Sequence, residues 1–104
     1  MIKKNFFSLL ILILLINKQA KSDSMLDMGK DIFLNKASCS TCHTLKDAGS
    51  DGQIGPNLND IRPGKIVVMN AVTNGIGVMP AYEGELSEDE IEAVSYYVST
   101  VSQQ

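Results

Sequence analysis

The chain has 104 residues and a formal charge of −3, which is enough for one domain. Residues 23–104 keep all twelve acidic residues but only five of the nine basic ones, so this part carries a formal charge of −7. So acidic a domain has no electrostatic reason to bind nucleic acid, and its charge favours a soluble protein with a basic partner.

The first 22 residues have the order of a secretory signal peptide. A basic start with Lys3 and Lys4 precedes residues 6–16, which are all apolar except Ser8, and a polar segment with small residues near its end. Eleven residues are too few to span a bilayer, which takes about 20. We therefore expect a signal peptide at 1–22 and a domain at 23–104 with no stable membrane span. The expected compartment is the periplasm, ahead of the thylakoid lumen, and an uncleaved anchor is the alternative.

Two helices are predicted from apolar residues at helical spacing, at 25–36 and at 65–73. Ser24 is a candidate cap for the first helix. The β-branched residues of the second would also permit a strand. Segments 44–59 and 75–84 are predicted loops because glycine and proline interrupt them. The partial stripe of the first helix consists of Leu26, Met28, Ile32 and Phe33.

The helix that follows Ser87 has the clearest signals in the sequence. Ser87 and Glu90 form an S-x-x-E capping box, in which each side chain satisfies a backbone donor of the other residue. Leu86 before the cap and Ile91 at the fourth helical position suit a hydrophobic staple. The predicted buried stripe is Ile91, Val94, Tyr97, Val98 and Val101. With no alternating strand pattern of useful length, the fold is predicted to be all-α.

Cys39-Ser40-Thr41-Cys42-His43 is a C-x-x-C-H motif, the signature of c-type haem attachment. Cysteines at i and i+3 project to the same side of a helical turn, so both can add to the vinyl groups of one haem. His43 then reaches the iron from that face. A domain this small needs an additional stabilising element, and a disulfide between cysteines three apart would close almost no loop. One covalent haem per chain satisfies that need.

Other uses of the motif fit less well. A thioredoxin-like cysteine pair expects a βαβ context, and a structural zinc site needs four protein ligands, whereas the chain has two cysteines and one histidine. A haem with two histidine ligands cannot be built from this chain alone. The sixth iron ligand is therefore methionine, another atom, water or nothing.

Four methionines follow the predicted signal peptide: Met25, Met28, Met69 and Met79. Met25 and Met28 precede the attachment motif closely, and Met69 on an apolar helix is predicted to fill the core. Met79 lies in a glycine-flanked loop that Pro80 stiffens by fixing its own φ. Met79 is the predicted sixth ligand.

Three motifs in this order resemble those of class I c-type cytochromes: Cys39–His43, Gly55-Pro56-Asn57-Leu58 and Met79-Pro80. The resemblance covers essentially all of the domain and implies a small cytochrome c fold, with three or four helices wrapped around one covalent haem. It also implies that Gly29 lets the first helix pack closely on the last, with Phe33 against Tyr97. Residues 71–82 are especially similar to soluble photosynthetic cytochromes and to haem subunits of sulfite dehydrogenases.

The resemblance further assigns roles around the haem. The carbonyl of Pro56 would accept a hydrogen bond from the ring of His43, and Leu58 would pack on the haem face. Together with Met79, these residues and the two cysteines are the predicted haem-binding set.

His/Met ligation suits one-electron transfer, because the soft thioether raises the potential of the iron. We therefore predict an electron carrier and no enzyme. Its partner would be a dehydrogenase, oxidase or reaction centre with a basic docking face, and the chain would be a monomer or a subunit of a heteromer. The alternatives are a haem subunit held in a larger dehydrogenase, such as a sulfite dehydrogenase, and a ligand-binding or peroxidatic haem protein.

Overall fold

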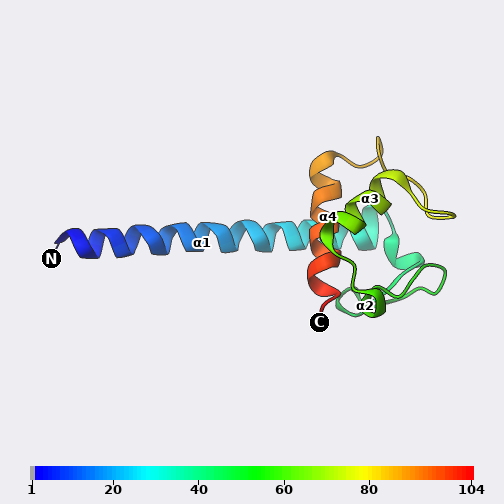
Figure 1. Ribbon diagram of the computed structural model, residues 1–104, viewed down its shortest axis with the longest axis horizontal. Helices are drawn as coiled ribbons and strands as arrows, with labels where there is room; N and C mark the ends of the chain where they lie inside the picture. Colours follow the sequence, from blue (N-terminus) through cyan, green and yellow to red (C-terminus); the bar gives the residue numbers. More distant parts are fainter. Residues whose placement is uncertain (1) are drawn as a thin grey trace.

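The computed structural model describes residues 2–104, with side chains from Phe7 onward, and most of this part of the chain is helical (Figure 1). The α-helices are α1 (Ile2–Asp31), α2 (Leu58–Ile61), α3 (Lys65–Asn74) and α4 (Glu88–Val101). The first part of α1 projects alone from the domain, and its last turns cross α4 (Figure 1). Within residues 2–104, none of the helices has the combination of length and hydrophobicity that a bilayer crossing requires.

The helix predicted at 25–36 is present, but it does not begin at Ser24. α1 runs unbroken through this residue, because the preceding Leu, Ile, Lys, Gln and Ala residues favour helix and nothing interrupts them. The predicted cap at Ser24 is therefore wrong. A π-helical turn, Ile32–Lys36, continues α1. Ile32 and Phe33 are buried as the stripe predicts, whereas Met28 is 45% exposed and does not belong to the core.

The crossing of α1 and α4 is the centre of the core. A Cβ atom on Gly29 would lie 2.3 Å from the carbonyl oxygen of Ala93 and 2.4 Å from Cβ of Tyr97, so only glycine permits this approach. The rings of Phe33 and Tyr97 have centroids 6.0 Å apart and planes at 59°, a geometry typical of tilted aromatic pairs. The contacts predicted for these residues are confirmed.

The start of α4 is also as predicted. Ser87 Oγ accepts a hydrogen bond from the Glu90 backbone N–H at 3.1 Å, and Glu90 Oε1 accepts one from the Ser87 N–H at 3.0 Å. Leu86 and Ile91 are both buried, which the staple requires. The predicted stripe is buried at every position: Ile91, Val94, Tyr97, Val98 and Val101.

The segment 65–73, ambiguous in the sequence, is helical as α3, and it packs against α4 through Val68 and Val72. The segment predicted as loop at 44–59 contains a small antiparallel hairpin, β1 (Thr44–Leu45) with β2 (Ser50–Asp51), which is too short to leave a pattern in the sequence.

A partly buried hydrogen-bond network joins this hairpin to the helix crossing. The Tyr97 hydroxyl donates to Asp47 Oδ2 at 2.7 Å, and Lys30 Nζ lies 3.5 Å from the same oxygen. Burial, and then the hydrogen bond and charge of Asp47, raise the pKa of Tyr97, so its hydroxyl remains a donor. The segment after the attachment motif is thereby fixed to the core.

Candidate functional site

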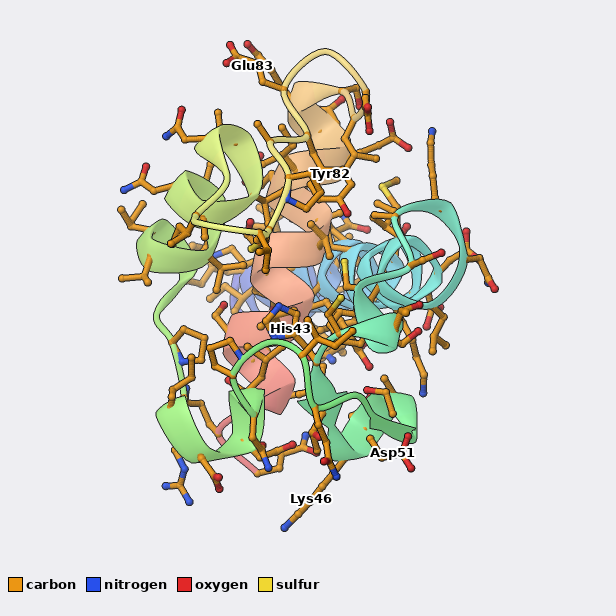
Figure 2. All side chains as sticks on the ribbon, turned by 90° about the vertical axis from the view of Figure 1, so that its right-hand side faces the viewer. His43, Lys46, Asp51, Tyr82 and Glu83 are labelled. Atoms are coloured by element: carbon orange, nitrogen blue, oxygen red, sulfur yellow. The ribbon has the colours of Figure 1, made fainter. Side chains whose placement is uncertain are left out.

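One side of the domain holds an apolar cavity of about 410 Å³, within the range of roughly 300–1,000 Å³ that small-molecule and cofactor sites occupy. Figure 2 looks onto this side, with His43 near the centre and Tyr82 above it. All six predicted haem-binding residues line the cavity: Cys39, Cys42, His43, Pro56, Leu58 and Met79. Met69 is not brought to this site, and lies beside Leu86 and Ser87 instead.

The two cysteines reach the cavity from a tight turn. Cys39–Thr41 form a 3₁₀ turn that follows Ser38, a residue in the left-handed conformation at φ +52°. Burial raises the pKa of the Cys39 thiol to about 11. A backbone hydrogen bond lowers this pKa by a smaller amount, and the nearby Cys42 raises it least. A neutral thiol is a poor metal ligand and a poor redox nucleophile, since both roles need the thiolate. Among the described residues, no group of three or more His, Cys, Asp or Glu side chains could hold a metal ion, which disfavours a zinc site at this motif.

His43 has a fixed orientation. Its Nδ1 lies 2.7 Å from the carbonyl oxygen of Pro56, and because a carbonyl only accepts, Nδ1 carries the proton. Nε2 is then the unprotonated nitrogen, the one available to a metal. The hydrogen bond predicted between these two residues is present.

Two glycines that the sequence analysis did not assign to the site make this geometry possible. A Cβ on Gly55 would lie 2.6 Å from His43 Cε1, and one on Gly52 would lie 2.6 Å from the carbonyl carbon of Cys42. The loop therefore lies flat on the attachment motif only because these positions have no side chain. The sequence signal for Gly55 was its place directly before Pro56.

Leu58 is positioned by the short helix α2. Asn57 caps this helix, with its Oδ1 accepting from the backbone N–H groups of Asn59 at 3.0 Å and Asp60 at 3.3 Å. Leu58 is 8% exposed and faces the cavity beside the α3 wall. That wall, also absent from the predicted set, consists of Val67, Val68, Ala71 and Val72.

Met79 lies in a loop with a rigid backbone. The backbone of Met79 and Ile76 is joined by two hydrogen bonds, Ile76 N–H to Met79 O at 3.1 Å and Met79 N–H to Ile76 O at 2.9 Å. Gly75 and Gly77 have φ of +73° and +56°, and a Cβ on Gly75 would lie 2.6 Å from Met79 O. The rigid loop predicted around Met79 is present, although glycine and this double bridge contribute as well as Pro80.

These residues fit a covalently attached haem: two adjacent thiols, an imidazole with Nε2 available, a thioether and apolar walls all line one cavity. Haem bound here supplies a one-electron iron couple. The protein's own part is to attach the group, orient His43 and keep the surroundings apolar.

Comparison with known proteins agrees with this reading. The family described as cytochrome C oxidase, cbb3-type, subunit III matches residues 24–98. The chain belongs to the c-type cytochromes. This cytochrome is 41% identical over 80 residues to cytochrome c6 of Euglena gracilis, with 69% of this chain and 87% of the relative covered. It is 32% identical over 77 residues to cytochrome c-551 of Halorhodospira halophila, with 70% and 99% covered.

A solved structure is similar over most of the domain. The c-type cytochrome SorU from Sinorhizobium meliloti has a TM-score of 0.75 and 49% sequence identity, covering 79% of this chain and 95% of that one. The predicted family, the small cytochrome c fold and haem c bound through Cys39 and Cys42 are confirmed. The chain is a haem c electron carrier that works with a redox partner.

Proposed function

We propose that this cytochrome carries single electrons between redox proteins outside the cytoplasm, through an iron that His43 and Met79 ligate. The observation that carries the proposal is that both side chains line the same cavity from separate segments of the chain. His43 has Nδ1 engaged by Pro56 and therefore offers Nε2. The thioether of Met79 is the soft second ligand, which favours a raised potential.

The same ligand pair argues for a carrier with no catalysis of its own. With His43 and Met79 both bound to the iron, a substrate would find no free coordination position. Ligand-binding and peroxidatic haem proteins need such a position. The hydrogen bond between His43 and Pro56 and the Ile76–Met79 bridges hold both ligand-bearing segments, which disfavours transient opening.

A redox titration of the exported holoprotein tests this function. We expect one optical wave with the slope of a one-electron couple, and slow binding of carbon monoxide by the reduced protein. Rapid carbon monoxide binding by the wild type would contradict the carrier assignment and favour a ligand-binding haem protein.

We also propose that residues 1–22 are a signal peptide and that 23–104 form the periplasmic domain. Side chains 7–21 are all exposed, and the first side-chain hydrogen bond from α1 to another element is at Ser22, whose hydroxyl lies 2.5 Å from that of Tyr96. The fold therefore depends little on the residues before position 22. N-terminal sequencing of the exported protein locates the cut.

The docking surface that we propose is acidic. Six acidic residues follow Met79 closely in the sequence, but two of them are neutralised by lysines: Glu90 pairs with Lys36, and Glu92 with Lys65 at 3.1 Å. The others are exposed and form no ion pair among the described residues: Glu83, Glu85, Glu88 and Asp89. Glu83 lies above Tyr82 at the top of the view, whereas Asp51 lies near the bottom (Figure 2).

Electron transfer to the true partner should slow as ionic strength rises, because complementary charge raises the encounter rate and salt screens it over about 10 Å at 0.1 M. At low salt, replacing Glu83→Lys with Glu85→Lys should lower the second-order rate by about tenfold or more, while the potential stays nearly unchanged. Stopped-flow mixing with the partner measures both effects.

A matched control changes the charge equally elsewhere. Asp27 on α1 and Asp51 on β2 are exposed and form no ion pair among the described residues, so Asp27→Lys with Asp51→Lys should have a much smaller effect. A rate that is flat or rising with salt, or an equal loss in the control pair, would reject acidic docking.

A further inference from the structure

We propose that Tyr82 is a positioning residue whose hydrogen bond, here called the latch, holds the Met79 loop (residues 75–86) against the haem-attachment segment (residues 37–43). The inference rests on the proposed ligation by Met79. The Tyr82 hydroxyl donates a hydrogen bond to the carbonyl oxygen of Ala37 at 3.1 Å, across 45 residues of sequence. Tyr82 is three residues after Met79, and Ala37 is two residues before Cys39. One side chain thus joins the segments that carry the two sides of the site.

Both ends of this connection are anchored. The Tyr82 backbone N–H donates to Val72 O at 2.8 Å, so its main chain is tied to α3. Its carbonyl accepts from the N–H of Leu86, two residues before α4, at 2.9 Å. Ala37 donates its own N–H to Ile32 O at 2.9 Å, which fixes it to the core. A movement of the loop relative to the attachment motif must therefore stretch the hydroxyl contact.

The contact has no substitute in the part of the chain that the structure describes. No other side-chain hydrogen bond there joins residues 75–86 to another segment, and the Ile76–Met79 bridges are internal to the loop. Tyr82 also lines the cavity together with both cysteines. Burial is the main cause that raises the pKa of Tyr82, so the hydroxyl stays protonated and able to donate.

The latch should resist the outward shift of the loop that dissociation of Met79 requires. Imidazole binding to the oxidised holoprotein measures this resistance, because an added ligand must displace Met79. One hydrogen bond contributes about 0.5–1.5 kcal/mol, so Tyr82→Phe should tighten imidazole binding by about 2- to 13-fold. Covalent haem should be retained, because the ring and both cysteines remain.

Tyr97→Phe is the matched control. It also removes a tyrosine hydroxyl with one hydrogen bond, to Asp47, but Tyr97 does not line the cavity. We expect this control to lower the denaturation midpoint and to leave imidazole affinity unchanged. If Tyr82→Phe also lowered the denaturation midpoint and left imidazole affinity unchanged, Tyr82 would have only a structural role and the proposed latch would be wrong.

A double-mutant cycle separates the latch from the ligand assignment. Met79→Ala should tighten imidazole binding strongly, and Tyr82→Phe should add nothing in that background. An equal gain in both backgrounds would mean that Tyr82 controls access to the cavity, and would overturn the latch. No response to Met79→Ala would overturn the ligand assignment and the latch with it. No response to Tyr82→Phe beside a responsive Met79→Ala would overturn the latch alone.

Discussion

Replacing Cys39 and Cys42 together by serine should abolish covalent haem and, with it, the stable fold. The two side chains provide the attachment at one wall of the cavity, and serine hydroxyls do not add to vinyl groups. Without the group, the cavity of about 410 Å³ leaves a small domain with an incomplete core. A haem-stained denaturing gel should lose its band, and circular dichroism should lose the cooperative unfolding transition.

The spacer residues of the motif provide the control. Ser40→Ala with Thr41→Ala changes two positions in the same turn without touching a thiol, and should retain a full haem band. Single replacement of either cysteine should give partial attachment with lowered stability. A haem band of wild-type intensity from the double serine variant, made in a host that matures c-type cytochromes, would contradict the attachment assignment.

Met79→Ala should change the absorption spectrum and the reduction potential of the haem strongly. Loss of the thioether should remove the weak far-red charge-transfer band that marks iron–methionine ligation in the oxidised protein. The potential should fall by an amount on the order of tenths of a volt, since axial ligands move haem potentials over about 0.8 V. The reduced variant should also bind carbon monoxide quickly, because one coordination position becomes available.

Met69→Ala is the appropriate comparison. Met69 is partly buried like Met79, but lies beside Leu86 and Ser87 outside the haem cavity. It should lower stability and leave the band and the potential unchanged. If Met69→Ala removed the band while Met79→Ala did not, the ligand assignment would be reversed.

The sequence was enough to predict six residues that line the cavity, because the motifs that contain them are local or use rare residues. Cys39 to His43 are contiguous, and the chain has no second histidine, so few arrangements were available. The start of α4 could be predicted equally well, because the residues of its cap and its hydrophobic staple all lie within Leu86–Ile91. That all six predicted residues line one cavity follows from these constraints together with the family resemblance.

What could not be predicted depends on contacts between distant segments. The hydroxyl of Tyr82 forms its hydrogen bond only because the carbonyl of Ala37 lies opposite. That pairing produces no periodic pattern in the sequence. Gly52 is required because the backbone of Cys42 packs against it and leaves no room for a side chain. The neutralisation of Glu90 and Glu92 depends likewise on lysines from other elements.

The errors concern local patterns that the surroundings overrode. Ser24 has the right chemistry for a cap, but helical residues on both sides continue α1 through it. Met28 fits an apolar stripe, but the crossing with α4 is set by Gly29, and Met28 is turned out to solvent. At both positions the surrounding structure, and not the local sequence pattern, determined the conformation or the burial of the residue.

The paired hydrogen bonds between Ile76 and Met79 also bear on the speed of electron exchange. An electron moves fastest when neither oxidation state requires the surrounding atoms to change position. With its main chain closed into a turn, Met79 has little freedom to follow a change in charge, and His43 is held in the same way by Pro56. The proposed ligation of the iron by these two residues therefore predicts a small reorganisation energy for electron exchange.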